Sequence, residues 1–219
     1  VVMPENVSPA KLALTRNIGA EVILHGQTGS EALAHCEQLV AGGDYYFLHP
    51  HKCPPFLAGS ETIAREIVED RPDTSRIYVP IGGGGLLSAI CAAAESSSTE
   101  IEVLGVEAEQ APAFARSFQA GRPVAIAEMD TIADALTINE PDGEVFDYVA
   151  SRTSRIVTVS EEEIVNAMRS LFDEFRVIAE PGGAASLAAM VKSDDGKNAA
   201  AIISGGNVSL DEFLQITGS

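Results

Sequence analysis

The sequence predicts an α/β protein in which largely parallel sheets are covered by helices. Short apolar segments rich in β-branched residues alternate with segments that carry helix start and stop signals, which is the pattern of strand–helix units. Glycine-rich loops follow two of the buried strands. The chain has 219 residues, 46% hydrophobic and 21% charged, so it is long enough and apolar enough to bury a real core and is not expected to be disordered.

The first fifty residues predict three strands and two helices. Residues 1–5 resemble the end of a strand that leaves its sheet at Pro4, and because the chain begins inside a strand without an initiator methionine, we expect it to be a fragment. Ser8 and Pro9 signal the start of a helix that continues over 11–18. Strands are predicted at 21–25 and 45–48, with a helix at 28–40 between them.

The remaining residues continue the alternation. Helices are predicted at 60–68 and 86–94, and another runs from the glycine pair at 182–183 to Lys192. Ser160 and Glu163 form a capping-box pattern that opens a further helix ending near 175. Buried strands are predicted at 76–81, 101–106, 156–159 and 199–203.

Charge and cysteine content exclude several classes of protein. The 14 basic and 32 acidic residues give a net charge of −18, which argues against a nucleic-acid partner, because such binding requires clustered Lys and Arg. No apolar run approaches the ~18–20 residues of a membrane span, so no membrane partner is expected. The odd, unevenly spaced set Cys36, Cys53 and Cys91 argues against a disulfide framework and predicts a cytoplasmic protein.

The loop after the strand at 76–81 is a candidate phosphate site. Its backbone N–H groups can converge without Cβ interference, and the following helix N-terminus adds positive partial charge. It matches neither the dinucleotide-binding nor the Walker pattern, which favours a monophosphate on a cofactor; the alternative is a turn required only for packing. The residues are Gly82, Gly83, Gly84, Gly85 and Leu86, here named the glycine loop.

Two other loops offer candidate ligands. Ser204 follows the last predicted strand, where its hydroxyl can reach the carboxyl edge of the sheet, although a simple turn is the alternative. His49, His51 and Cys53 could suggest a metal site, but their spacing lacks the usual paired ligands of structural zinc sites.

Four motifs in order resemble the threonine dehydratase and serine racemase family of pyridoxal-phosphate enzymes. They are Gly-Gly-Gly-Gly-Leu at 82–86, Thr-Ile-Ala-Asp at 131–134, Glu-Pro-Gly-Gly-Ala at 180–184 and Ser-Gly-Gly-Asn-Val at 204–208. The stretches at 2–5, 19–22 and 47–50 are also similar to that family. The resemblance covers essentially the whole chain.

The resemblance implies the two-lobed β-family (fold type II) architecture, similar to the tryptophan synthase β subunit, with pyridoxal phosphate between the lobes. Residues 1–50 would complete the small lobe and 51–219 would form the large, cofactor-binding lobe. The glycine loop would hold the cofactor phosphate, Ser204 would contact the pyridine nitrogen and keep it unprotonated, and Glu180 would lie near the ring. A solvated acid at a helix start is the alternative for Glu180.

Two departures from the family pattern affect the site. Part of the family binds a divalent cation, for which Glu107 and the Ala111 carbonyl match, but the position of the third ligand, an acid, is Ala113, which weakens this site. Ala135 replaces the glycine that family members usually place beside the cofactor, and its methyl group is expected to narrow the substrate pocket.

The resemblance also implies a function and an absence. None of the four lysines, Lys11, Lys52, Lys192 and Lys197, stands in the context of the Schiff-base lysine, so no catalytic residue is assigned in this chain and it is expected to be inactive alone. The full-length protein is expected to be an L-threonine/L-serine dehydratase (ammonia-lyase) of amino-acid metabolism, such as isoleucine biosynthesis, assembled as a homodimer or homotetramer. The alternatives are a serine racemase or other hydroxy-amino-acid lyase, or a non-catalytic binding protein without the lysine.

Overall fold

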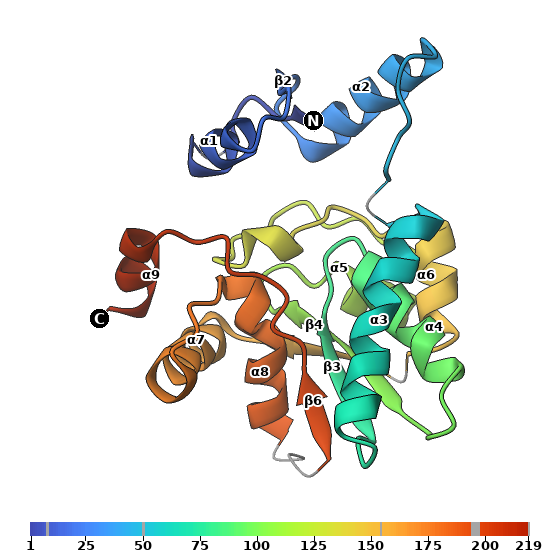
Figure 1. The fold of residues 1–219 in the computed structure, drawn as a ribbon, viewed down its shortest axis with the longest axis vertical. Coiled ribbons are helices and arrows are strands. Elements are labelled where there is room, and N and C mark those ends of the chain that lie inside the picture. Colours follow the sequence, from blue (N-terminus) through green and yellow to red (C-terminus); the bar gives the residue numbers. More distant parts are fainter. Residues whose placement is uncertain (8, 50, 154, 194–197, 219) are drawn as a thin grey trace. The chain divides into compact units, whose positions relative to one another are not determined.

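The chain forms two compact units, Val1–His49 and Pro50–Ser219. The computed structural model describes residues 1–7, 9–49, 51–153, 155–193 and 198–218 (Figure 1). The sequence predicted the lobe boundary after residue 50, and the compact units divide after His49. Each unit has its own sheet, so each is described by itself.

The first unit is a small parallel β-pair with two helices. Strands β1 (Val2–Met3) and β2 (Ile23–Leu24) pair in parallel, and they are connected through α1 (Pro9–Asn17). Helix α2 (Gly29–Ala41) begins with a capping box in which Thr28 and Glu31 satisfy each other's backbone N–H groups.

The strand predicted at 45–48 is wrong. These residues have no regular secondary structure, and they pair with no strand in the part of the chain that the structure describes. Aromatic composition favoured a strand, but Tyr46 and Leu48 are 76% and 63% exposed, so their side chains have no packed surface to stabilise one.

The second unit contains a four-stranded parallel sheet. Its strands are β3 (Arg76–Pro80), β4 (Glu102–Ala108), β5 (Arg155–Val159) and β6 (Ala199–Ala201), in the spatial order β5-β4-β3-β6. All three neighbouring pairs are parallel, as the alternation of strand and helix signals predicted. Because β3 and β6 are neighbours, the loops that follow them emerge side by side.

Helices cover both faces of this sheet (Figure 1). One face carries α3 (Pro54–Asp70), α4 (Gly85–Glu95) and α6 (Gly143–Ala150), whose apolar side chains share a core with Ile77 and Val79. The other carries α7 (Glu161–Phe175), α8 (Pro181–Ser193) and α9 (Leu210–Thr217), which share a core with Tyr78. Adjacent residues of β3 thus point to opposite cores, and the strand is almost entirely apolar because both its faces are buried.

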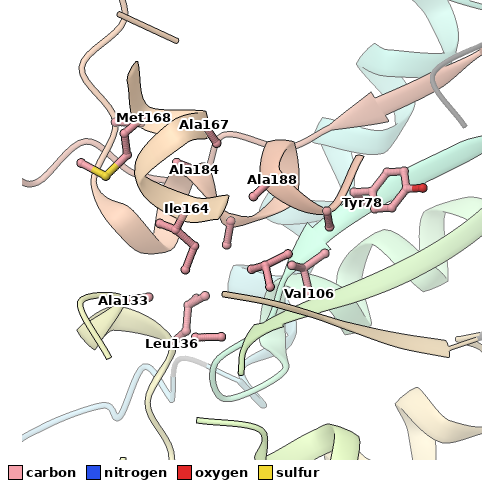
Figure 2. Packing of buried hydrophobic residues seen from close by; sticks show 14 of the residues in the cluster. Tyr78, Val106, Ala133, Leu136, Ile164, Ala167, Met168, Ala184 and Ala188 are labelled. Carbon is pink, nitrogen blue, oxygen red and sulfur yellow. The ribbon is translucent and has the colours of Figure 1, made fainter. Parts of the chain in front are cut away.

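The core on the α7–α8 side extends to a short 3₁₀ helix, η1 (Asp134–Leu136), that lies among the site loops. Figure 2 shows Ala133 and Leu136 beside Ile164 of α7. The buried packing of these two residues therefore fixes the backbone on either side of Ala135.

Local signals located some elements and missed others. The capping box at Ser160 is present, whereas α3 begins at Pro54 rather than near residue 60, because two prolines occupy its first turn. Helices α5 (Ala113–Ala120), α6 and α9 and the 3₁₀ turn were not predicted. Among the described helices, none combines the length and apolarity needed to cross a bilayer.

Candidate functional site

The glycine loop and the loop that contains Ser204 lie at the same edge of the sheet. The first follows β3 and the second follows β6, and the Ile202 N–H donates to the Tyr78 carbonyl at 3.0 Å, which continues the pairing of the two strands. The carboxyl edge of a parallel sheet is where ligands bind in α/β proteins. The four motifs that resemble a cofactor site are brought together here.

The glycine loop is shaped by close backbone approaches. A Cβ atom on Gly82 would lie 3.0 Å from the carbonyl oxygen of Ala135, and one on Gly83 would overlap the imidazole ring of His51. Gly84 is the N-cap of α4 and has φ = +88°, a left-handed backbone conformation that residues with a side chain rarely adopt. The first turn of α4 holds no acidic residue, so its N–H groups face the loop with their positive partial charge uncancelled.

Ala135 faces outward between two buried neighbours. Ala133 and Leu136 are 0% and 6% exposed, whereas Ala135 is exposed. The Glu161 carboxylate accepts the Ile132 N–H at 2.9 Å and so ties the segment before η1 to the start of α7. This arrangement presents the Ala135 methyl group at the site.

The start of α8 contacts both neighbouring loops. A Cβ atom on Gly182 would lie 3.4 Å from the Ala135 Cβ, and one on Gly183 would overlap the backbone of Gly205. The Glu180 N–H donates to the Gly205 carbonyl at 3.1 Å, and the Glu180 carboxylate lies against the Gly205 Cα. Glu180 is therefore beside the loop that contains Ser204, and Ser204 itself is exposed at this edge.

The arrangement fits the phosphate of a cofactor. A tight anion cradle requires converging N–H groups and no Cβ atoms in the way, and the close approaches at the first two glycines together with the left-handed Gly84 meet that requirement. Side chains at Gly82 or Gly83 would collide with the Ala135 carbonyl oxygen or the His51 ring, so the loop backbone could not keep this path. The residues present thus fit a phosphate held by backbone N–H groups and a helix N-terminus.

His51 contacts the glycine loop, and the sequence did not predict this position. The sequence suggests His51 only as a candidate metal ligand, whereas the structure places its ring over Gly83. Its neighbour Lys52 pairs with Asp142 at 2.7 Å and with Glu144 at 3.0 Å, which fixes the segment on the start of α6, and the sequence carries no local signal for these contacts. The hydrogen bonds to Asp142 and then to Glu144 raise the pKa of Lys52.

The other lysines lie elsewhere. Lys11 is in α1 of the first unit, and Lys197 lies outside the described residues. Lys192, near the end of α8, pairs with Glu163 at 3.0 Å and with Glu109 at 3.3 Å, and the hydrogen bond to Glu163 is the main cause of its raised pKa. Both Lys52 and Lys192 therefore have ion-pair partners of their own.

The structure gives no support to the candidate cation site at Glu107 and Ala111, which the missing third acid had already weakened. Glu107 is fully buried, and its two oxygens accept the Phe114 and Ala115 N–H groups at 2.8 Å each. The Ala111 carbonyl accepts the Ala113 N–H at 3.1 Å. Within the described ranges, no group of three or more His, Cys, Asp and Glu side chains is placed to hold a metal, which applies also to Cys53 and its neighbouring histidines.

Burial sets the proton affinity of Glu107. It raises the pKa of this carboxyl from its ordinary 4.5 to about 7, against the opposing effect of the backbone N–H groups that it accepts. By accepting the first N–H groups of α5, the Glu107 side chain acts as the N-terminal cap of that helix. The N-cap residue itself, Pro112, makes no side-chain cap hydrogen bond.

Comparison with known proteins agrees with this geometry. The family described as "Pyridoxal-phosphate dependent enzyme" matches residues 1–205. An L-threonine ammonia-lyase of Thermotoga maritima is 37% identical over 218 residues, which are 99% of this chain and 54% of that protein. The chain thus spans about half the length of that curated relative.

Solved structures give the same result. The processed form of threonine deaminase isoform 2 from Solanum lycopersicum superposes with a TM-score of 0.90 at 26% identity, covering 99% of this chain and 65% of that one. Maize serine racemase gives a TM-score of 0.89, also at 26% identity, over 98% of this chain and 67% of that one. The two-lobed α/β fold of type II and the pyridoxal phosphate cofactor follow from this kinship: the chain belongs to the family of pyridoxal-phosphate-dependent enzymes that includes the threonine ammonia-lyases.

Proposed function

We propose that the complete protein is an L-threonine/L-serine dehydratase, which eliminates water from the substrate and releases a 2-oxo acid and ammonia. The observation that supports this most is the convergence of the glycine loop, η1, the start of α8 and Ser204 at one sheet edge. The named function of the Thermotoga maritima relative points the same way.

Each residue at this edge has a definite task in the proposal. The N–H groups of the glycine loop, Gly82, Gly83, Gly84, Gly85 and Leu86, bind the cofactor phosphate. When bound, pyridoxal phosphate supplies an electron sink for the carbanion left by removal of the substrate Cα proton. The Ser204 hydroxyl is a neutral partner for the ring nitrogen, and Glu180 lies beside Gly205, where it orients the Ser204 loop.

We further propose that the lysine which carries the cofactor lies outside this chain. Two of the lysines are committed to ion pairs, Lys52 with Asp142 and Lys192 with Glu163, and Lys11 lies in α1 of the first unit. The chain alone would then bind the phosphate group but complete no turnover. We place the full-length protein in the cytoplasm, as a homodimer or homotetramer with a role such as isoleucine biosynthesis.

Product analysis of the protein expressed from its complete gene tests this proposal. With L-threonine as substrate we expect 2-oxobutanoate and ammonia in equal amounts, and with L-serine pyruvate and ammonia. Borohydride reduction should fix the cofactor on a lysine upstream of Val1. Absence of both keto acids from a protein that holds the cofactor would overturn the dehydratase assignment.

A racemase is the second candidate. The close superposition on a maize serine racemase supports it, since one fold serves both reactions. Chiral chromatography separates the two: D-serine without keto acid would favour the racemase. A complete gene that begins near Val1 and encodes a protein without bound cofactor would favour the third reading, a non-catalytic binding protein.

A further inference from the structure

The ring of His51 covers Gly83 of the glycine loop. A Cβ atom on Gly83 would overlap the Nε2, Cε1 and Cδ2 atoms of the imidazole, so ring and backbone are in direct contact. The same side chain lines a cavity of about 260 Å³ together with Ser88 and Ala89, which belong to the first turns of α4. His51 therefore lies beside the N-terminus of the helix that the glycine loop opens.

Apart from those of His51, the atoms that lie closest to the Cβ positions of Gly82, Gly83 and Gly84 include no hydrogen-bond donor. The closest neighbours of Gly82 are the backbone atoms of Ala135 and Leu136, and those of Gly84 are the side chains of Val145 and Phe114. A phosphate monoester carries up to two negative charges and three strong acceptor oxygens. An imidazole offers one N–H donor when neutral and two when protonated, so His51 is suited to supply what the apolar neighbours cannot.

The backbone that follows His51 is fixed at two successive residues. Lys52 pairs with Asp142, the N-cap of α6, and with Glu144 in its first turn. Cys53, which is 4% exposed, is the N-cap residue of α3. A residue whose following backbone is anchored loses less conformational freedom when it binds a ligand, which favours a binding role.

We propose that His51 completes the phosphate site by donating an imidazole N–H to a cofactor phosphate oxygen, in addition to the backbone N–H groups of the loop. This rests on the proposed cofactor-binding function of the glycine loop and adds a side-chain ligand to it. Glycine is required at position 83 because any side chain there would displace the ring from this place.

Equilibrium binding to the apo form of the complete protein tests the proposal with two probes, pyridoxal 5′-phosphate and pyridoxal. The variants are His51→Ala and His51→Gln, and His49→Gln is the matched control because His49 belongs to the other compact unit. We expect His51→Ala to weaken pyridoxal 5′-phosphate binding about tenfold, the effect of one charge-assisted hydrogen bond, with pyridoxal binding unchanged. His51→Gln, which keeps an N–H donor, should recover part of the loss, and His49→Gln should bind as the wild type does.

The outcomes distinguish failure of the His51 role from failure of the proposed cofactor-binding function. Equal binding of pyridoxal 5′-phosphate by wild type and His51→Ala would overturn the role of His51. Equal weakening of both probes would overturn it as well, because the defect would then be independent of phosphate. Failure of the wild type to bind pyridoxal 5′-phosphate would instead overturn the proposed function itself. Thermal unfolding of each variant shows that the proteins compared are folded.

Discussion

The buried carboxylate of Glu107 accepts the backbone N–H of Phe114 at 2.8 Å, and its second oxygen accepts the next N–H along the chain. A strand residue thus caps the first turn of α5, and the helix start has no exposed polar cap of its own. Helix α5 in turn supplies Phe114 to the core that packs against Gly84 of the glycine loop.

Glu107→Ala should destabilise the protein. Removal of the acceptor leaves the buried Phe114 N–H and the half-buried Ala115 N–H unpaired and a cavity in place of the carboxylate, so we expect a loss of about 2–4 kcal/mol. The free energy of unfolding in urea measures it. Glu100→Ala, an exposed change on the same unit, is the control and should stay within about 0.5 kcal/mol of the wild type. Equal stability of the two variants would show that α5 does not depend on this cap.

The same carboxyl should make stability depend on pH. Burial raises the folded-state pKa of Glu107 to about 7, above its ordinary 4.5, so between these values the folded protein holds a proton that the unfolded chain has released. Stability contributed by this group therefore falls as pH rises from about 4.5 to 7, by a total on the order of 3 kcal/mol. The loss ends about one unit above the folded-state pKa, near pH 8.

Glu107→Gln isolates this effect, since the amide has the same shape and does not titrate. The free energy of unfolding of wild type minus that of the variant, measured at pH 5, 6, 7, 8 and 9, should decrease through pH 7 and level off near pH 8. Contributions from all other carboxyls cancel in the difference. Parallel pH curves for the two proteins would contradict the assignment.

Helix α5 also illustrates which features the sequence could predict. The alternating β-branched and capped segments predicted the parallel sheet, and the capping box at Ser160 is where it was expected, because these signals are local. The start of α5 was missed because its cap is a glutamate on a neighbouring strand, six residues before the helix. Contacts of that kind exist only in the folded chain.

The candidate site likewise has residues that the sequence could predict and one that it could not. The glycine loop and Ser204 could be found because each follows a buried strand, and the adjacency of β3 and β6 then brings them together. The position of His51 over Gly83 could not be found, since it depends on the ion pairs of Lys52 with α6, a helix that was itself not predicted. Residues 45–48 show the converse error, in which a segment of strand-like composition finds no partner strand among the described residues.

Gly183→Ala should impair cofactor binding. The new methyl group would overlap the Gly205 backbone, which cannot move aside as a flexible side chain would, so the loop that contains Ser204 must shift. We expect at least about a tenfold increase in the dissociation constant for pyridoxal 5′-phosphate in the complete protein, the equivalent of one lost hydrogen bond or more.

Gly59→Ala is the matched control for that change. It lies inside α3, where a Cβ atom meets nothing within 4 Å, so the substitution should leave cofactor binding unchanged and raise stability by about 0.5–1 kcal/mol through helix propensity. Similar cofactor affinity in both glycine variants would show that the close approach of the α8 start to the Ser204 loop is unimportant for the site.

Ala135→Gly should alter substrate preference. The methyl group of Ala135 is exposed at the site between the buried Ala133 and Leu136, and its backbone is fixed by their packing and by the contact of its carbonyl with Gly82. Removing it opens space about the size of one methyl group without releasing that packing, and the threonine side chain exceeds that of serine by one methyl group. A pocket discriminates one methylene by about 1–3 kcal/mol, so kcat/KM for L-threonine relative to L-serine should rise by about tenfold or more.

Steady-state kinetics with both amino acids on the complete enzyme measure this ratio. Thermal unfolding of the variant checks whether the added backbone freedom of glycine lowers its stability. An unchanged ratio in a stably folded variant would show that Ala135 does not limit the substrate pocket.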